Sequence, residues 1–204
     1  MRADEFSDSL GKNSRHLAIV AEKQRAIEMR MAEVCKEQEQ LVEDLAAVGV
    51  QVKSAWELLS DKAAYPAALP VLLAHLARPY SSASKESIVR ALNVPESAPY
   101  WPVLLSIYER ESSTLPSNVV DALAFALADL AIVRRDKDDE IIRLLSDTRL
   151  GESRVCLLRA VAFSKNRGVR TKLTDYTTDP LLGLLARKYL KRRKPASSTG
   201  DEGE

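Results

Sequence analysis

Apolar residues recur at alternating steps of three and four from Leu17 to Val48. One position of the repeat reads Leu17, Gln24, Met31, Gln38 and Leu45, and the other reads Val20, Ile27, Val34, Leu41 and Val48. Neither proline nor glycine interrupts this stretch before Gly49. The pattern predicts a coiled-coil helix over residues 17–49, with the eight apolar members as a self-association seam.

The polar residues beside this seam bear on how the helix pairs. Gln24 and Gln38 share one seam position, and buried polar residues there restrict the register. The flanking positions carry Lys23 and Arg30 early and acidic residues later, at 37 and 44. This asymmetry favours antiparallel pairing or a helix that folds back on its own chain. The alternative is a single amphipathic helix that caps the following segment.

A different pattern follows the seam. Two stretches align with each other with no gap. The first is Leu72–Leu76, a turn and Ile88–Leu92, and the second is Ile141–Leu145, a turn and Leu157–Val161. Each is a short apolar helix, a polar turn and a second apolar helix. Pairs of this kind stack into solenoids, because one pair cannot bury its apolar face alone. We therefore expect an all-α fold, a short α-solenoid preceded by a long helix.

Prolines and polar turns divide the rest of the chain into four helix pairs. The first runs over about 66–93, the second over 100–133 with a longer inner loop, the third over 138–163 and the fourth over 168–193. The expected organisation is a flexible leader at 1–16, the coiled-coil helix at 17–49, the solenoid at 50–194 and a disordered tail at 195–204.

Composition adds limits rather than an activity. The formal net charge is +1, so no overall field attracts nucleic acid. Residues 187–194 nevertheless carry six basic groups and no acid. Two distant cysteines form no disulfide framework, and the first residues lack the order of a signal peptide. The expected location is the cytoplasm, without a membrane span.

No catalytic, cofactor or metal motif is present in the sequence. His16 and His75 lack a metal-ligand neighbour at helical spacing, and we expect His75 to be a core or groove-edge residue. Glycine-rich phosphate loops and nucleophile elbows are missing. We expect a protein that is not an enzyme and needs no cofactor or metal.

The repeated segments carry a resemblance to a known family. The stretch Ser146–Arg154 followed by Val155–Leu158 is similar to segments of small prokaryotic HEAT-repeat proteins with phycobilisome-lyase-type repeats. The resemblance covers residues 65–190 and implies fold more than function. It implies that acids in turns pair with arginines of second helices, here Asp147 with Arg159 and Asp175 with Arg187. The alternative is an anion site built from Arg149, Arg154 and Arg159.

A HEAT-like stack is typical of proteins that bind other proteins, so we expect a scaffold or adaptor whose second helices line a concave face. The candidate residues on that face are Lys85, Glu86, Arg90, Asn118, Asp121, Phe125, Asp129, Arg154 and Arg159. Their mixed charge favours a protein partner, with a homodimer through the coiled coil as a second contact.

Two other functions remain open at this stage. Some HEAT-like proteins act on alkylated DNA, and the resemblance implies that Tyr100, Trp101 and Asp121 would serve a nucleic-acid-binding version. Residues 51–186 carry 17 basic and 16 acidic groups, which weakens that hypothesis. A role that assists an enzyme, like that of the chromophore lyases, is implied only by distant repeat similarity.

Overall fold

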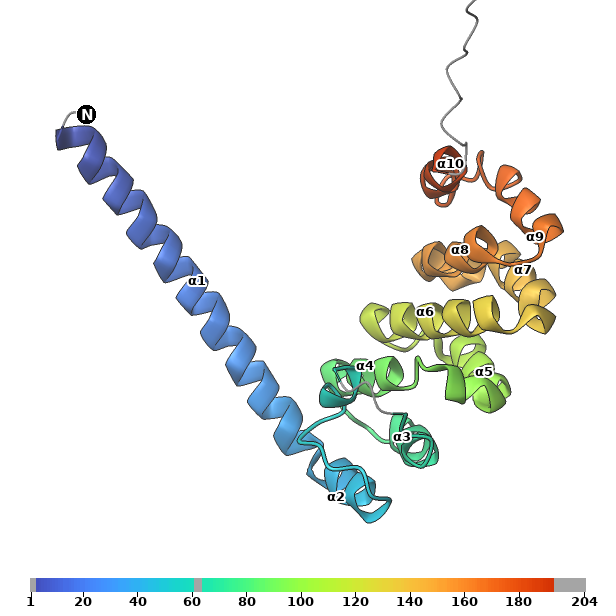
Figure 1. Cartoon of the computed structure of the whole chain (residues 1–204), viewed down its shortest axis with the longest axis horizontal. Helices are drawn as coiled ribbons and strands as arrows, with labels where there is room; N and C mark the ends of the chain where they lie inside the picture. The colour runs from blue at the N-terminus through green and yellow to red at the C-terminus, as the bar shows by residue number, and fades with distance from the viewer. Residues whose placement is uncertain (1–2, 61–63, 193–204) are drawn as a thin grey trace, which may run out of the picture.

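The computed structural model describes residues 3–60 and 64–192, and the regular structure within these ranges is entirely helical (Figure 1). The expected all-α class is confirmed. The α-helices are α1 (Ala3–Glu37), α2 (Glu39–Ala47), α3 (Ala68–Leu76), α4 (Ser82–Ala91), α5 (Trp101–Glu111), α6 (Ser117–Val133), α7 (Asp138–Ser146), α8 (Arg154–Phe163), α9 (Arg167–Thr171) and α10 (Gly183–Lys191). Short 3₁₀ turns lie between them, at η1 (Glu57–Leu59), η2 (Pro95–Tyr100), η3 (Arg135–Lys137), η4 (Thr148–Ser153) and η5 (Lys172–Thr174).

The long N-terminal helix differs from the expectation at both ends. It begins at Ala3 rather than Leu17, so part of the predicted leader is helical. No proline stops the backbone there, and each added residue of a helix gains one hydrogen bond. The predicted helix to residue 49 is also interrupted, because Gln38 leaves helical geometry between α1 and α2 (φ −93°, ψ 10°). The predicted tail at 195–204 lies outside the described residues.

Three pairs of consecutive helices pack against each other, α3 with α4, α5 with α6 and α7 with α8, close to the predicted bounds of the first three pairs. Helices α3, α5 and α7 lie on one side of the body, and α4, α6 and α8 lie on the other (Figure 1). Helix α4 packs against α6, α6 against α8, and α10 against α8. Long helix α1 projects away from the body on the side of α4 (Figure 1).

One apolar core runs through the helix pairs. Its fully buried members include Leu72 of α3, Ile88 of α4, Leu104 of α5, Leu123 of α6 and Leu157 of α8. Burying such a side chain stabilises the fold by about 1.5–3 kcal/mol. The two aligned repeats of the sequence therefore supply core residues of the first and third pairs, on either side of α5 and α6.

Gly49 ends α2 through its backbone conformation. Its φ of +87° lies in the left-handed region, which costs most other residues about 1 kcal/mol or more. The Gly49 N–H donates to Ala46 O, and the Val50 N–H donates to Leu45 O. This is a Schellman cap, which satisfies the last carbonyls of the helix and turns the chain toward η1.

His75 is a buried residue of α3, as the sequence predicted for a core or groove-edge position. Its Nε2 lies 2.7 Å from Asp44 Oδ2 of α2, and its Nδ1 lies 2.7 Å from the Tyr80 hydroxyl. The Tyr80 ring also stacks on the imidazole. Nε2 therefore joins α3 to α2, and Nδ1 holds Tyr80 in the turn between α3 and α4. Among the described helices, none is long and apolar enough to cross a membrane.

Candidate functional site

The second helices of successive pairs present one polar surface. We call it the second-helix face, and it comprises the partly or fully exposed side chains of Lys85, Glu86, Arg90, Asn118, Asp121, Phe125, Asp129 and Arg159. These residues come from α4, α6 and α8, which pack side by side. All nine predicted partner-binding residues therefore lie on adjoining helices, and eight of them are partly or fully exposed.

Hydrogen bonds link this face across the helices. Asn118 of α6 donates its amide to Glu86 of α4 at 2.7 Å. Asp129 of α6 accepts from Asn93 after α4 at 3.1 Å and from the Arg159 Nε of α8 at 2.7 Å. Asp129 is thus bonded to both neighbouring units. The polar groups hold the register of the helices and leave a surface of mixed charge.

Phe125 stands near the middle of this polar surface. Its ring is 38% exposed although most of α6 is buried. Asp121 and Asp129 lie four residues before and after it, so the three share one side of the helix. A second exposed ring, Phe163 of α8, lies under the Arg159 guanidinium, with 5.6 Å between Arg159 Cζ and the ring centroid. Exposed aromatic rings within a polar surface are typical of protein interfaces.

The carboxyl of Asp121, on the second-helix face, has a pKa above its usual value. Burial raises the pKa of its carboxyl, the negative charge of Glu152 raises it further, and Arg90 acts in the opposite direction. Burial, as the main cause, and the charge of Asp121, as the second cause, raise the pKa of the neighbouring Cys156 thiol to about 12. Cys156 is partly buried against the core and is held as a thiol, which suits the apolar role expected from its neighbours.

Arg154 does not lie on the second-helix face. Only 6% of it is exposed, and its guanidinium donates to Leu145 O at 2.8 Å and to Asp179 Oδ2 at 2.9 Å. Arg154 was predicted from its sequence position on α8, but the turn of the helix points it inward. It joins the third helix pair to the segment before α10.

The predicted ladder of acids and arginines forms with other partners. Arg159 bonds to Asp129 rather than to Asp147, and Asp147 accepts from its near neighbour Arg149. Arg187 donates to Thr177 O rather than to Asp175. The pairing predicted from the twelve-residue spacing is therefore wrong, because these side chains bond to the groups nearest in space. The three arginines of the predicted anion site have separate partners and do not converge.

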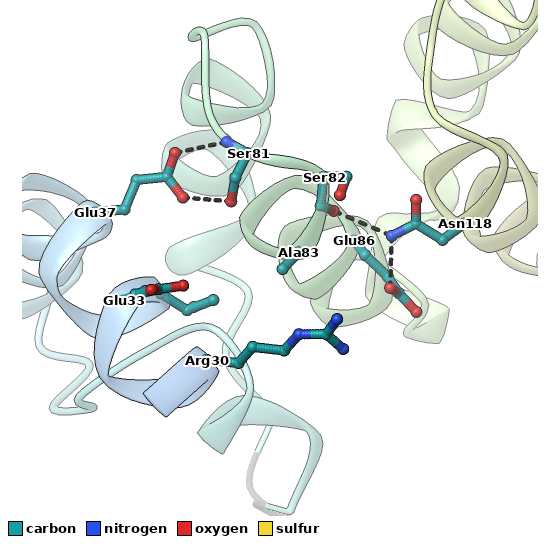
Figure 2. A pocket seen from close by; sticks show the side chains of 9 residues that line it. Arg30, Glu33, Glu37, Ser81, Ser82, Ala83, Glu86 and Asn118 are labelled. Atoms are coloured by element: carbon teal, nitrogen blue, oxygen red, sulfur yellow. Dashed lines mark hydrogen bonds between the residues drawn. The ribbon is translucent and has the colours of Figure 1, made fainter. Parts of the chain in front are cut away.

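A cavity of about 470 Å³ lies where α1 leaves the body (Figure 2). Its lining comes from α1, from α4 with the residue before it, and from α6, and consists of Arg30, Glu33, Val34, Glu37, Ser81, Ser82, Ala83, Glu86 and Asn118. It adjoins the second-helix face through Glu86 and Asn118. The cavity is open and polar, and Arg30 extends across it from α1 toward the α4 side (Figure 2).

Glu37 of α1 is one of the residues that line this cavity. It accepts hydrogen bonds from the Ser81 N–H, from the Ser81 hydroxyl at 2.6 Å and from the Ser84 hydroxyl. Burial raises the pKa of Glu37, but these hydrogen bonds together outweigh it and hold the pKa below its usual value. The charged carboxylate thus fixes the end of α1 to the start of α4.

The predicted self-association seam is divided at this junction. Val34, Leu41 and Leu45 are buried within the chain. Every side chain from His16 to Glu33 is exposed, including the seam residues Leu17, Val20, Ile27 and Met31, and Val48 is also exposed. The late half therefore packs on the body, in agreement with the alternative of a helix that folds back, while no described residue covers the early half.

Trp101 and the possible metal ligands bear on base stacking and on metal binding, respectively. Trp101 was a candidate for stacking on nucleic-acid bases, but it is buried and its indole N–H donates to Glu140. Lys137 covers the ring, with 5.6 Å between Nζ and the centroid. Within residues 3–60 and 64–192, no group of three or more His, Cys, Asp or Glu side chains is placed to hold a metal ion.

The sequence pattern predicted neither the cavity nor the hydrogen bonds of Glu37 with Ser81 and Ser84. Glu37 was assigned to the flank of a coiled coil, and Ser81 and Ser84 carried no signal. These residues lie more than forty positions apart in the chain. A serine-rich helix start was visible in the sequence, but nothing in it showed which carboxylate the serines would bind.

Comparison with known proteins adds no relative. No protein-family description, no functionally characterised protein and no solved structure matches the chain. The resemblance to HEAT repeats therefore stays a prediction from the sequence pattern.

Proposed function

We propose that the protein is a non-enzymatic scaffold in which a short HEAT-like α-solenoid holds a protein partner on the second-helix face. The observation that carries this proposal is the exposure of Phe125 at the middle of the face. Removing a phenylalanine ring from water lowers the free energy. An exposed ring among fixed polar groups is therefore suited to be buried by a partner.

The surroundings of Phe125 suit a folded or helical protein partner better than a small molecule. Interfaces commonly join an aromatic anchor with a polar rim that excludes water. Here Asp129, Arg159, Asn118 and Glu86 supply such a rim, and their mutual hydrogen bonds hold them in place before a partner arrives. Preorganised side chains lose less entropy on binding, which favours affinity.

A nucleic-acid-binding function has less support. Phosphate binding needs unpaired basic groups, whereas Arg159 is bonded to Asp129 and Arg154 is buried on Asp179. The exposed basic residues Arg187, Lys188, Lys191 and Arg192 lie on or just after α10 rather than on the second-helix face. Binding to a DNA duplex that weakens steeply as salt rises would favour this alternative.

Affinity capture with the full chain tests the scaffold proposal. Phe125→Ser removes the anchor, and Val103→Ser is the control, because Val103 is similarly exposed on α5 of the opposite side. We expect the wild-type chain and the control to retain the same proteins and the Phe125→Ser chain to lose them. Retention of the same proteins by all three chains would contradict the proposal.

A further inference from the structure

The early half of α1 carries an apolar stripe that residues 3–60 and 64–192 leave uncovered. We define the α1 stripe as Leu17, Val20, Gln24, Ile27 and Met31. Its four apolar members are between 39% and 65% exposed. Long helices in water owe most of their stability to packing of an amphipathic face, so a helix of this length with an open apolar stripe is suited to a partner.

We propose that the α1 stripe pairs in parallel with the α1 stripe of a second copy of the chain. The stripe continues, in the same heptad register, the seam that Val34, Leu41 and Leu45 already use for packing. Its spacing of alternating three and four residues matches another helix of the same period. This inference goes beyond the proposed function, because it concerns self-association rather than the second-helix face.

Charge decides the direction of pairing. In a parallel coiled coil, the residue just before one seam position of the first kind, such as 24, faces a residue of the other helix. That residue comes just after the following seam position of the second kind, such as 27. Lys23 then faces Glu28 of the second copy, and the same pair recurs by symmetry. In an antiparallel pair Lys23 faces Lys23 or Arg30 of the second copy, and like charges there are unfavourable. The acids that favoured antiparallel pairing, Glu37 and Asp44, are bound within the chain.

The body of the protein leaves room for this arrangement. Glu37, Val34 and Gln38 mark the side of α1 that faces the body. A straight α-helix advances about 100° per residue, which places the centre of the α1 stripe roughly 70° round from that side. Two parallel helices joined at their stripes therefore direct their bodies to opposite sides of the pair.

The stripe is tested by the mass of the full chain in sedimentation equilibrium over a concentration series. We expect a dimer for the wild-type chain and a dissociation constant raised about a hundredfold or more by Ile27→Glu. Met29→Glu is the matched control, because Met29 is equally exposed but lies on the opposite side of α1. A monomeric wild-type chain, or a dimer that Ile27→Glu leaves intact, overturns the proposal.

The direction is tested with Gln24→Cys in a chain that also carries Cys35→Ser. In a parallel pair the two copies of position 24 face each other, so oxidation links them into a disulfide-bonded dimer. Met29→Cys in the same background should stay unlinked. A dimer that fails to link at position 24, or links only when Gln24→Cys chains are mixed with Ile27→Cys chains, overturns the parallel arrangement. Phe125→Ser should remain dimeric, which keeps this test separate from that of the second-helix face.

Discussion

Gln38 and Ser87 join the end of α1 to α4 by a hydrogen bond of 2.8 Å from the glutamine amide to the serine hydroxyl. The same amide also contacts Ser84 O, and the Gln38 side-chain oxygen accepts the Ala55 N–H at 2.9 Å. Gln38 is fully buried and satisfied. It sits where the backbone departs from helical geometry, so one side chain fixes the bend between α1 and α2 and hence the direction of α1.

Replacing Gln38 should destabilise the fold, whereas replacing its heptad counterpart Gln24 should not. Gln38→Leu leaves the buried Ala55 N–H without its acceptor, and we expect the free energy of unfolding to fall by about 1–3 kcal/mol. Gln24→Leu is the control, since Gln24 occupies the same heptad position but is exposed and bonds only to Glu28. Urea unfolding of both variants measures the difference. Equal losses would show that Gln38 is not a structural lock.

A second prediction concerns the two arginines on either side of the turn before α8. Arg154→Ala should lower the free energy of unfolding by about 2–3 kcal/mol, because it removes two buried hydrogen bonds of a charged group. Arg149→Ala should leave stability unchanged, since the Arg149 side chain is exposed and its pair with Asp147 is solvated. Thermal and urea unfolding provide the measurement. A stable Arg154→Ala chain would contradict a structural role for this residue.

The contact between His75 and Asp44 should make stability depend on acid pH. The hydrogen bond from His75 holds the pKa of Asp44 below its usual value, with help from Gln40 and Arg78. A carboxyl with a lower pKa in the folded state than in the unfolded state adds stability above about pH 4, its unfolded value. That contribution disappears as pH falls through the folded pKa.

Asp44→Asn should remove this dependence. We expect the free energy of unfolding to fall less steeply for Asp44→Asn than for the wild-type chain as pH is lowered below about 4. Both chains are also compared at neutral pH, where any loss reflects the changed hydrogen bond alone. Parallel pH profiles for the two chains would contradict the coupling between Asp44 and folding.

Cys156 should be chemically inert in the folded chain. Burial, followed by the charge of Asp121, raises the pKa of its thiol to about 12, so almost none is thiolate near neutral pH. In a Cys35→Ser background, a thiol reagent at pH 8 should react on the order of a thousandfold more slowly with the folded chain than with the urea-unfolded chain. Similar rates in the two states would show that the thiol is not shielded.

The sequence pattern was sufficient for the helices because their periodicity is local. The outer bounds of α5 with α6 and of α7 with α8 lie within about two residues of the pairs predicted at 100–133 and 138–163, since prolines and polar turns mark where apolar runs begin and end. The break at Gln38 could not be predicted. A glutamine at a seam position is compatible with an unbroken coiled coil, and its actual acceptors and donors lie at residues 55, 84 and 87.

By itself, the sequence determined an all-helical chain, because apolar spacing dictates which side of each helix must be buried. It also placed the nine proposed partner-binding residues on adjoining helices, and eight of them are partly or fully exposed. Only the tertiary structure decided that Arg154 turns inward, that Asp129 bonds Arg159, and that the seam divides at Val34. Those outcomes depend on which groups meet in space, and contacts between distant residues carry no periodic signal along the chain.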